Sequence, residues 1–175
     1  MAIVQLLAKT TYFMLPAIIA NITPVFFRRL HFLDYPIDFN LTFKGKPLLG
    51  KNKTFRGMFF GTLAAILVAY LQYLFSNSWL LTDYSHWFVI GFLLGFGALT
   101  GDFVESFFKR RLGIKPGRRF FPWDQIDFVV GSLLFVSLSF VPTWPVMLSA
   151  LIIIPLGTIV VAHLGYYLHL RAERW

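Results

Sequence analysis

The chain has 175 residues, of which 57% are hydrophobic and only 14% are charged, and it carries a formal charge of +8. Soluble domains carry about 25% charged residues, so this composition excludes an ordinary soluble domain and indicates a membrane protein. The lack of cysteine excludes disulfides, thiol catalysis and cysteine-ligated zinc sites.

Five apolar runs predict an all-α integral membrane protein with about five transmembrane helices in a single domain, residues 1–175. The predicted spans are residues 6–27, 57–75, 87–108, 125–141 and 146–168. The first run is expected to be retained as a span, because it lacks a basic n-region and is too long for a signal peptide. Within it, Pro16, Asn21 and Pro24 predict a kinked or broken helix.

Lysine and arginine gather in alternate connections between these spans. Residues 28–56 and 109–124 are rich in both, whereas residues 76–86 and 142–145 contain neither. The positive-inside rule therefore predicts cytoplasmic loops at 28–56 and 109–124 and an N-terminus outside. It places the C-terminal tail, with Arg171 and Arg174, in the cytoplasm. We expect a multi-pass protein of the cell membrane that binds no nucleic acid, since topology already explains the positive charge.

Glycines recur along the third span at small-xxx-small spacing, which favours close helix packing. They are Gly91, Gly95, Gly97 and Gly101.

Asp102 follows these glycines and lies within an apolar span. A carboxylate at the bilayer centre costs about 2.5–3.5 kcal/mol on insertion scales, so either a buried salt bridge or a functional role must offset it. Glu105, Ser106 and Lys109 follow at i+3, i+4 and i+7, which places them on the same helical face.

Two more acids, Asp124 and Asp127, open the fourth span at i and i+3. Acids at this place also cap helices and interact with the helix dipole, which is the structural alternative. Together with Asp102, however, they predict a cluster of carboxylates from two neighbouring helices. Clustered carboxylates repel one another unless a cation lies between them, and oxygen ligands suit Mg²⁺. We therefore predict one or two Mg²⁺ ions bound by Asp102, Asp124 and Asp127, with the active site facing the cytoplasm.

The basic loops supply a complement to the acids. Residues 46–57 mix Lys, Arg, Asn and Thr with glycines, groups that neutralise and hydrogen-bond a polyphosphate. Attraction to anionic lipid headgroups is the alternative for the charge alone.

These motifs resemble the CDP-diacylglycerol synthase superfamily, whose members are CTP-dependent cytidylyltransferases. Residues 52–57, Asn-Lys-Thr-Phe-Arg-Gly, are similar to its Lys-Lys-Thr-Trp-Glu-Gly stretch. Gly-Asp at 101–102 and Ser-Phe-Phe-Lys-Arg at 106–110 match its Gly-Asp and Ser-x-x-Lys-Arg in order and spacing. Residues 124–127, Asp-Gln-Ile-Asp, are similar to its Asp-Arg-x-Asp. The Lys-Asp and His-Gly-Gly elements are missing from 112–123, and the short chain resembles the archaeal branch, the CDP-archaeol synthases.

The resemblance implies transfer of cytidylate from CTP to 2,3-bis-O-geranylgeranylglycerol 1-phosphate, an isoprenoid ether-lipid phosphate, with release of pyrophosphate. The residues expected to act in catalysis are Asp102, Asp124, Asp127, Lys53, Lys109 and Arg110. The residues expected to bind CTP are Asn52, Lys53, Thr54, Arg56, Ser106, Lys109, Arg110 and Gln125.

Two other functions compete with this interpretation. A CDP-diacylglycerol synthase would act on ester-linked phosphatidate instead. A non-enzymatic anion or lipid transporter would need a polar path through the bilayer midplane, whereas the ionisable groups here are confined to the predicted cytoplasmic half. The sequence leaves the oligomeric state open.

Overall fold

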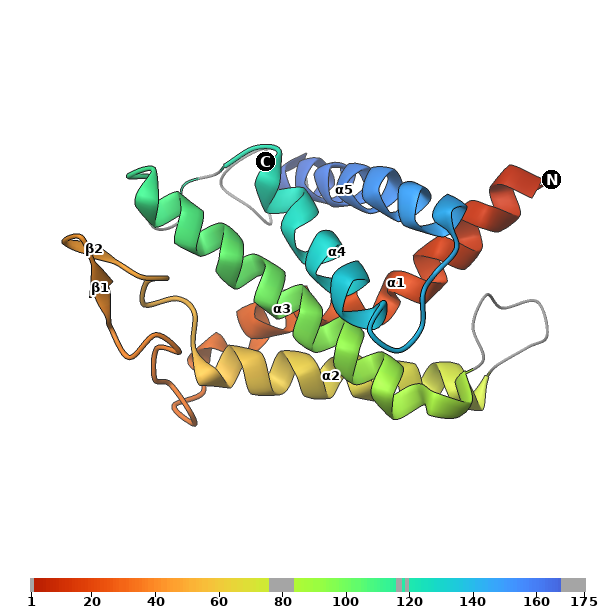
Figure 1. The fold of residues 1–175 in the computed structure, drawn as a ribbon, viewed down its shortest axis with the longest axis horizontal. Helices are drawn as coiled ribbons and strands as arrows, with labels where there is room; N and C mark the ends of the chain where they lie inside the picture. The colour runs from red at the N-terminus through yellow and green to blue at the C-terminus, as the bar shows by residue number, and fades with distance from the viewer. Residues whose placement is uncertain (1, 76–83, 116–117, 119, 168–175) are drawn as a thin grey trace.

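The computed structural model describes residues 2–75, 84–115, 118 and 120–167, and in these residues the chain forms five long helices and one small hairpin (Figure 1). The helices are α1 (Ala2–Phe26), α2 (Phe55–Leu74), α3 (Trp87–Arg111), α4 (Trp123–Val136) and α5 (Trp144–Tyr167). Strands β1 (Thr42–Phe43) and β2 (Lys46–Pro47) pair antiparallel, and 3₁₀ turns occupy Phe27–Arg29 and Tyr84–His86. The prediction of a mostly helical protein is confirmed.

Four of the five helices are long and apolar enough to cross a membrane: α1, α2, α3 and α5. α1 runs as one helix through Pro16 and Pro24 and changes direction along its length (Figure 1). α5 begins at Trp144, and residue 168 of the predicted fifth span lies outside the described residues.

α4 is shorter than the predicted span 125–141, because it ends at Val136. Its 14 residues rise about 21 Å at 1.5 Å each, less than the hydrocarbon thickness of about 30 Å. The hydroxyl of Ser137 turns back to donate to the Leu133 carbonyl at 2.6 Å, and the chain then leaves the helix ahead of Pro142. Membrane crossing by five helices is thus not confirmed.

The helix ends that border the two basic connections lie on one side of the molecule (Figure 1). The end of α1 and the start of α2 lie at the lower left of this view, and the end of α3 and the start of α4 lie above them. The cytoplasmic placement of these connections, which the charge pattern predicted, stays a prediction. Arg119 and the tail residues Arg171 and Arg174 lie outside the described residues.

Small residues bring the helices into close contact, as the glycine spacing predicted. A Cβ atom added at Gly95 would lie 2.4 Å from the Ala65 side chain of α2, and one at Gly97 would lie 2.6 Å from the Gly131 carbonyl of α4. The side chains of Phe13, Leu94 and Phe128 fill the core between α1, α3 and α4. Large apolar side chains cover the outside instead, which suits a surface in contact with lipid. They include Leu63, Leu67, Leu134, Leu148, Ile152 and Leu156, all more than half exposed.

Candidate active site

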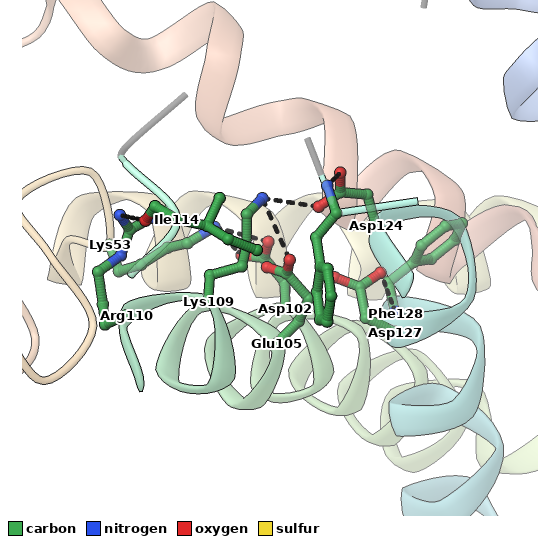
Figure 2. Close-up of polar contacts among 10 residues, drawn as sticks. Lys53, Asp102, Glu105, Lys109, Arg110, Ile114, Asp124, Asp127 and Phe128 are labelled. Atoms are coloured by element: carbon green, nitrogen blue, oxygen red, sulfur yellow. Dashed lines mark hydrogen bonds and ion pairs between the residues drawn. The ribbon is translucent and has the colours of Figure 1, made fainter. Parts of the chain in front are cut away.

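Three carboxylates meet where α3 and α4 cross near their basic ends. Asp102 and Glu105 project from α3, and Asp127 projects from α4 (Figure 2). One carboxylate oxygen from each lies within 4.8 Å of the other two. Their spacing in sequence explains part of this, because residues at i and i+3 share a helical face. We call Asp102, Glu105 and Asp127 the acidic cluster.

A glycine contact sets the distance between the two helices that carry the acidic cluster. A Cβ atom at Gly101 would lie 2.2 Å from the Asp127 carbonyl oxygen, and one at Gly131 would lie 2.2 Å from the Gly97 carbonyl oxygen. No side chain fits in either gap, so the α3 and α4 backbones touch. The contact brings Asp127 against Asp102, its neighbour across the helix crossing.

Two lysines balance the negative charge. The Lys53 ammonium donates to both carboxylate oxygens of Asp102 at 2.6 Å. The Lys109 ammonium lies 3.1 Å from Glu105 Oε1 and 2.7 Å from Asp124 Oδ1 (Figure 2). The Lys109–Glu105 contact is an ion pair, and the buried Glu105 Oε1 has no further partner among the described residues.

The structure groups the acids differently from the sequence-based set of Asp102, Asp124 and Asp127. Asp124 accepts from Lys109 through Oδ1 and from the Phe120 backbone N–H through Oδ2, at 2.7 and 2.6 Å. Both oxygens are therefore engaged one turn before Asp127. Glu105, to which no role was assigned, joins Asp102 and Asp127 instead.

Three cavities adjoin the acidic cluster. The central cavity, of about 340 Å³, contains the carboxylates themselves. The apolar groove, of about 520 Å³, runs between α3 and α4 and shares Glu105 and Asp127 with the central cavity. The lateral cavity, of about 550 Å³, lies against α1, α2 and α3 on the other side. It shares five residues with the central cavity, namely Asn21, Lys51, Asn52, Lys53 and Asp102.

Asp38 shapes the loop that carries Lys53 to the cluster. Its side chain, in a residue only 5% exposed, accepts backbone N–H bonds from Asn40, Leu49 and Gly50 at 3.0, 2.8 and 3.1 Å. Burial alone would raise the pKa of Asp38, but these three donors outweigh burial and hold its pKa below the usual value. The ionised carboxylate thus fixes the loop just before Lys53.

Arg111 fastens the hairpin of the same loop to the end of α3. Its guanidinium donates to the Phe43 and Pro47 carbonyls at 2.6 and 2.5 Å, and it stacks between the rings of Phe43 and Phe107. The Lys46 ammonium in turn donates a hydrogen bond to the Arg111 carbonyl at 3.0 Å. The hairpin is therefore docked on α3 beside the site.

The residues predicted to bind CTP fall into three groups. Those that line the central cavity are Asn52, Lys53, Ser106, Lys109 and Arg110, together with the catalytic candidates Asp102, Asp124 and Asp127. Thr54 and Arg56 line the lateral cavity, where Thr54 caps α2 by accepting from the Gly57 N–H and Arg56 pairs with Asp34 at 2.9 Å. Gln125 lines none of the three cavities, and its buried Oε1 has no partner among the described residues.

Sequence reasoning assigned no site role to Glu105 and Asn21, which line the central cavity, or to Asp38, which holds the loop beside it. Glu105 was on the right face but was not distinguished from a structural acid. Asn21 is a polar residue inside an apolar span, a signal that marks functional positions in membranes, although we interpreted it only as a source of a kink. Asp38 gave no signal in sequence, because its role depends on a fold of the loop that brings residue 49 back to residue 38.

Comparisons with known proteins agree with one another. A family model described as CarS-like, CDP-archaeol synthase, matches residues 3–175. The CDP-archaeol synthase of Thermofilum pendens is 37% identical over 96% of this chain and 81% of its own length. That of Archaeoglobus fulgidus is 37% identical over 98% of this chain and 99% of its own. A solved structure described as an intramembrane enzyme for archaeal membrane lipids biosynthesis superposes with a TM-score of 0.73 at 33% identity, covering 86% of this chain and 90% of that one.

Proposed function

The chain belongs to the CDP-archaeol synthase family of nucleotidyltransferases, and from this premise we propose that it transfers cytidylate from CTP to 2,3-bis-O-geranylgeranylglycerol 1-phosphate. Pyrophosphate is the second product, and the reaction takes place at the cytoplasmic face of the cell membrane. One observation carries the proposal: a charged cavity that suits a nucleotide lies beside an apolar groove that suits a lipid, and the two share Glu105 and Asp127 of the acidic cluster.

The reaction is a displacement at phosphorus. An oxygen of the lipid phosphate attacks the α-phosphorus of CTP, a new P–O bond forms, and the bond to the bridging oxygen of the β-phosphate breaks. The lipid phosphate is already ionised, so no side chain has to remove a proton from it. Such transfers need positioning and neutralisation of charge more than a protein nucleophile. The described site offers both.

The acidic cluster fits a hard divalent cation. Its oxygens come from two helices held in backbone contact, and among the described residues the buried Glu105 Oε1 has no partner except the Lys109 ammonium. We propose that Asp102, Glu105 and Asp127 hold Mg²⁺, which supplies neutralising charge for the phosphates. Asp124 takes a different role here, because it orients the Lys109 ammonium at the edge of the cluster.

The cationic side chains of the central cavity complete the nucleotide site. Lys53 and Lys109 hold their ammonium groups beside the acidic cluster, where phosphate oxygens arrive. Arg110 is 8% exposed and donates to the Ile114 carbonyl at 2.6 Å, while its buried Nε has no partner among the described residues. These three groups neutralise the triphosphate, and the Ser106 hydroxyl and the Asn52 amide orient it.

The apolar groove suits the lipid. Its walls include Val104, Phe108 and Leu134, which are 51–64% exposed on the outside of α3 and α4. An isoprenoid chain seated there has its polar end beside Glu105 and Asp127. The lipid phosphate then reaches the acidic cluster while the isoprenoid chains stay in the hydrocarbon layer of the membrane.

The proposal is tested by incubating the purified chain in detergent with α-labelled CTP, Mg²⁺ and one lipid phosphate at a time. We expect label in the CDP-lipid with the ether-linked isoprenoid substrate and much less with ester-linked phosphatidate. Asp102→Asn should abolish the incorporation, and chelation of Mg²⁺ should do the same. Equal use of the ester lipid would contradict the lipid assignment. Full activity of Asp102→Asn would contradict the site.

A further inference from the structure

One face of α2 forms an apolar stripe along the whole helix. Its members recur every four residues and are 44–57% exposed: Phe59, Leu63, Leu67 and Leu71. Because side chains at i and i+4 share a helical face, they form one surface, which we call the lipid-facing stripe. α2 is apolar enough to cross a membrane, and its 20 residues rise about 30 Å, the thickness of the hydrocarbon layer. The first turns of α2 therefore lie near one edge of that layer.

The loop between α1 and α2 folds two phenylalanines onto those first turns. The ring of Phe39 packs on that of Phe55, the first residue of α2 and one turn before Phe59, with centroids 5.5 Å apart. The ring of Phe32 meets that of Phe59 edge to face at 6.4 Å. Both loop rings stay open on their outer side, because Phe32 is 59% and Phe39 71% exposed. The lipid-facing stripe thus continues from α2 onto the loop, which runs beside the start of the helix (Figure 1).

Positive charge accompanies the exposed rings. Arg29 ends the 3₁₀ turn after α1, three residues before Phe32, and is exposed. Among the described residues it forms no ion pair, and it lines none of the three cavities, so the proposed reaction gives it no role. Aromatic rings concentrate where hydrocarbon meets headgroups, and a guanidinium beside them pairs with anionic headgroups. The loop thus carries the two kinds of side chain that a negatively charged membrane surface attracts.

We propose that Arg29, Phe32 and Phe39 form a membrane-contact surface that binds the interface of an anionic lipid bilayer. The two rings lie between the headgroups at the end of the lipid-facing stripe, and the guanidinium pairs with the anionic groups above them. This inference goes beyond the proposed function and does not depend on it. Asp38, which fixes the backbone before Lys53, directly precedes Phe39. The contact therefore anchors to the membrane the outer side of the loop that carries Lys53.

The lack of cysteine in the chain allows a single labelled position to test the contact. Phe32→Cys and Phe39→Cys are each labelled with nitrobenzoxadiazole and reconstituted in vesicles of phosphatidylcholine and phosphatidylglycerol in equal amounts. We expect both labels to be quenched by nitroxide lipids and shielded from aqueous iodide. Lys115→Cys is the control: it is exposed in the other basic connection and should show the reverse. One of the two loop variants suffices if the other fails to fold.

Recognition of the anionic headgroup is measured with the label at residue 32. Phosphatidylglycerol with a nitroxide on its acyl chain should quench about fivefold more than the matching phosphatidylcholine, because one arginine at a lipid surface contributes about that factor in affinity. Arg29→Gln should remove most of this preference, whereas Arg29→Lys should keep it. High salt should weaken the preference in the wild-type background, since it screens charges at the surface.

Three results would overturn the proposal. Loop labels that iodide reaches and nitroxide lipids do not would show that the rings lie in water. Labels shielded from both quenchers would show that protein, such as a second copy of the chain, covers the rings in place of lipid. Equal quenching by the two nitroxide lipids, unchanged in Arg29→Gln, would show that the surface does not select anionic headgroups.

Discussion

The two regions that deliver charge to the central cavity are built in different ways. The acids come from the α3–α4 crossing, where glycines let backbones touch and the position of each carboxylate follows from helix packing. Lys53 comes from the loop before α2, where Asp38 and Arg111 fix the backbone through individual hydrogen bonds. Packed helices resist displacement, whereas a loop fixed by a few polar contacts can adjust. We therefore expect the acids to be held rigidly and Lys53 to be the more easily displaced group.

The largest loss of activity is expected from substitution of Glu105, and it should exceed the loss from substitution of Asp124, the other acid beside Lys109. Glu105→Gln removes a member of the acidic cluster, so activity should fall about 10³-fold and half-saturation should need much more Mg²⁺. Asp124→Asn weakens the contacts with Lys109 and with the Phe120 N–H but leaves the acidic cluster intact, so activity should fall about 10–100-fold with the Mg²⁺ requirement nearly unchanged. Activity titrations with Mg²⁺ measure both. The reverse ranking would restore Asp124 to the metal site and exclude Glu105.

The next effect tests the helix crossing itself. Gly101→Ala introduces a Cβ 2.2 Å from the Asp127 carbonyl oxygen, so α4 must move away from α3. We expect a loss of about 1–3 kcal/mol in stability and about 100-fold in turnover. Gly157→Ala is the control, because its Cβ meets nothing within 4 Å in α5 and should leave both unchanged or slightly improve stability. Thermal unfolding and the CTP assay report the two quantities. A tolerated Gly101→Ala would show that the crossing does not set the site.

A smaller effect, on the KM for CTP, should follow from loosening the loop before α2. Asp38→Asn keeps the size of the side chain, but its amide nitrogen cannot accept the bonds that Leu49 and Gly50 donate to Oδ2. The KM for CTP should rise about tenfold through misplaced Lys53, while the Mg²⁺ requirement stays the same because the acidic cluster is intact. Lys44→Gln, in the same loop but outside the three cavities, should have no effect. Equal changes in KM for both variants would argue against a positioning role for Asp38.

The smallest effect is a dependence on pH. The pKa of Asp38 is lowered in the folded chain, so its contribution to stability is full above the unfolded pKa of about 3.9 and is lost as the pH falls through the folded value. The difference in Tm between wild type and Asp38→Asn should therefore be constant from about pH 5 to 7 and shrink below about pH 4. Thermal unfolding in detergent across this range measures it. A difference that persists unchanged at pH 3 would mean that the carboxylate charge is not what holds the loop.

The helices and the polar face of α3 could be predicted from sequence because both are local patterns. Apolar run length predicted the positions of the helices, although α4 is shorter than its predicted span, and helical periodicity grouped Asp102 with Glu105. The grouping of Glu105 with Asp102 and Asp127 could not be predicted, because it depends on how α3 and α4 pack and on the contacts that Lys109 makes with both Glu105 and Asp124. The conformation of the loop before α2 could not be predicted from the sequence either. Its backbone has positive φ at Phe39, Asn40 and Lys44, and of these residue types only asparagine is enriched in this conformation.

The apolar groove opens through exposed Phe108 and Leu134 to the surroundings of α3 and α4. A reactant that uses this opening arrives by lateral diffusion within two dimensions and not from bulk solution. Its effective concentration is then its mole fraction among the surrounding amphiphiles. Diluting the mixed micelles with more detergent would slow the enzyme even while the molar amounts of enzyme and lipid stay the same.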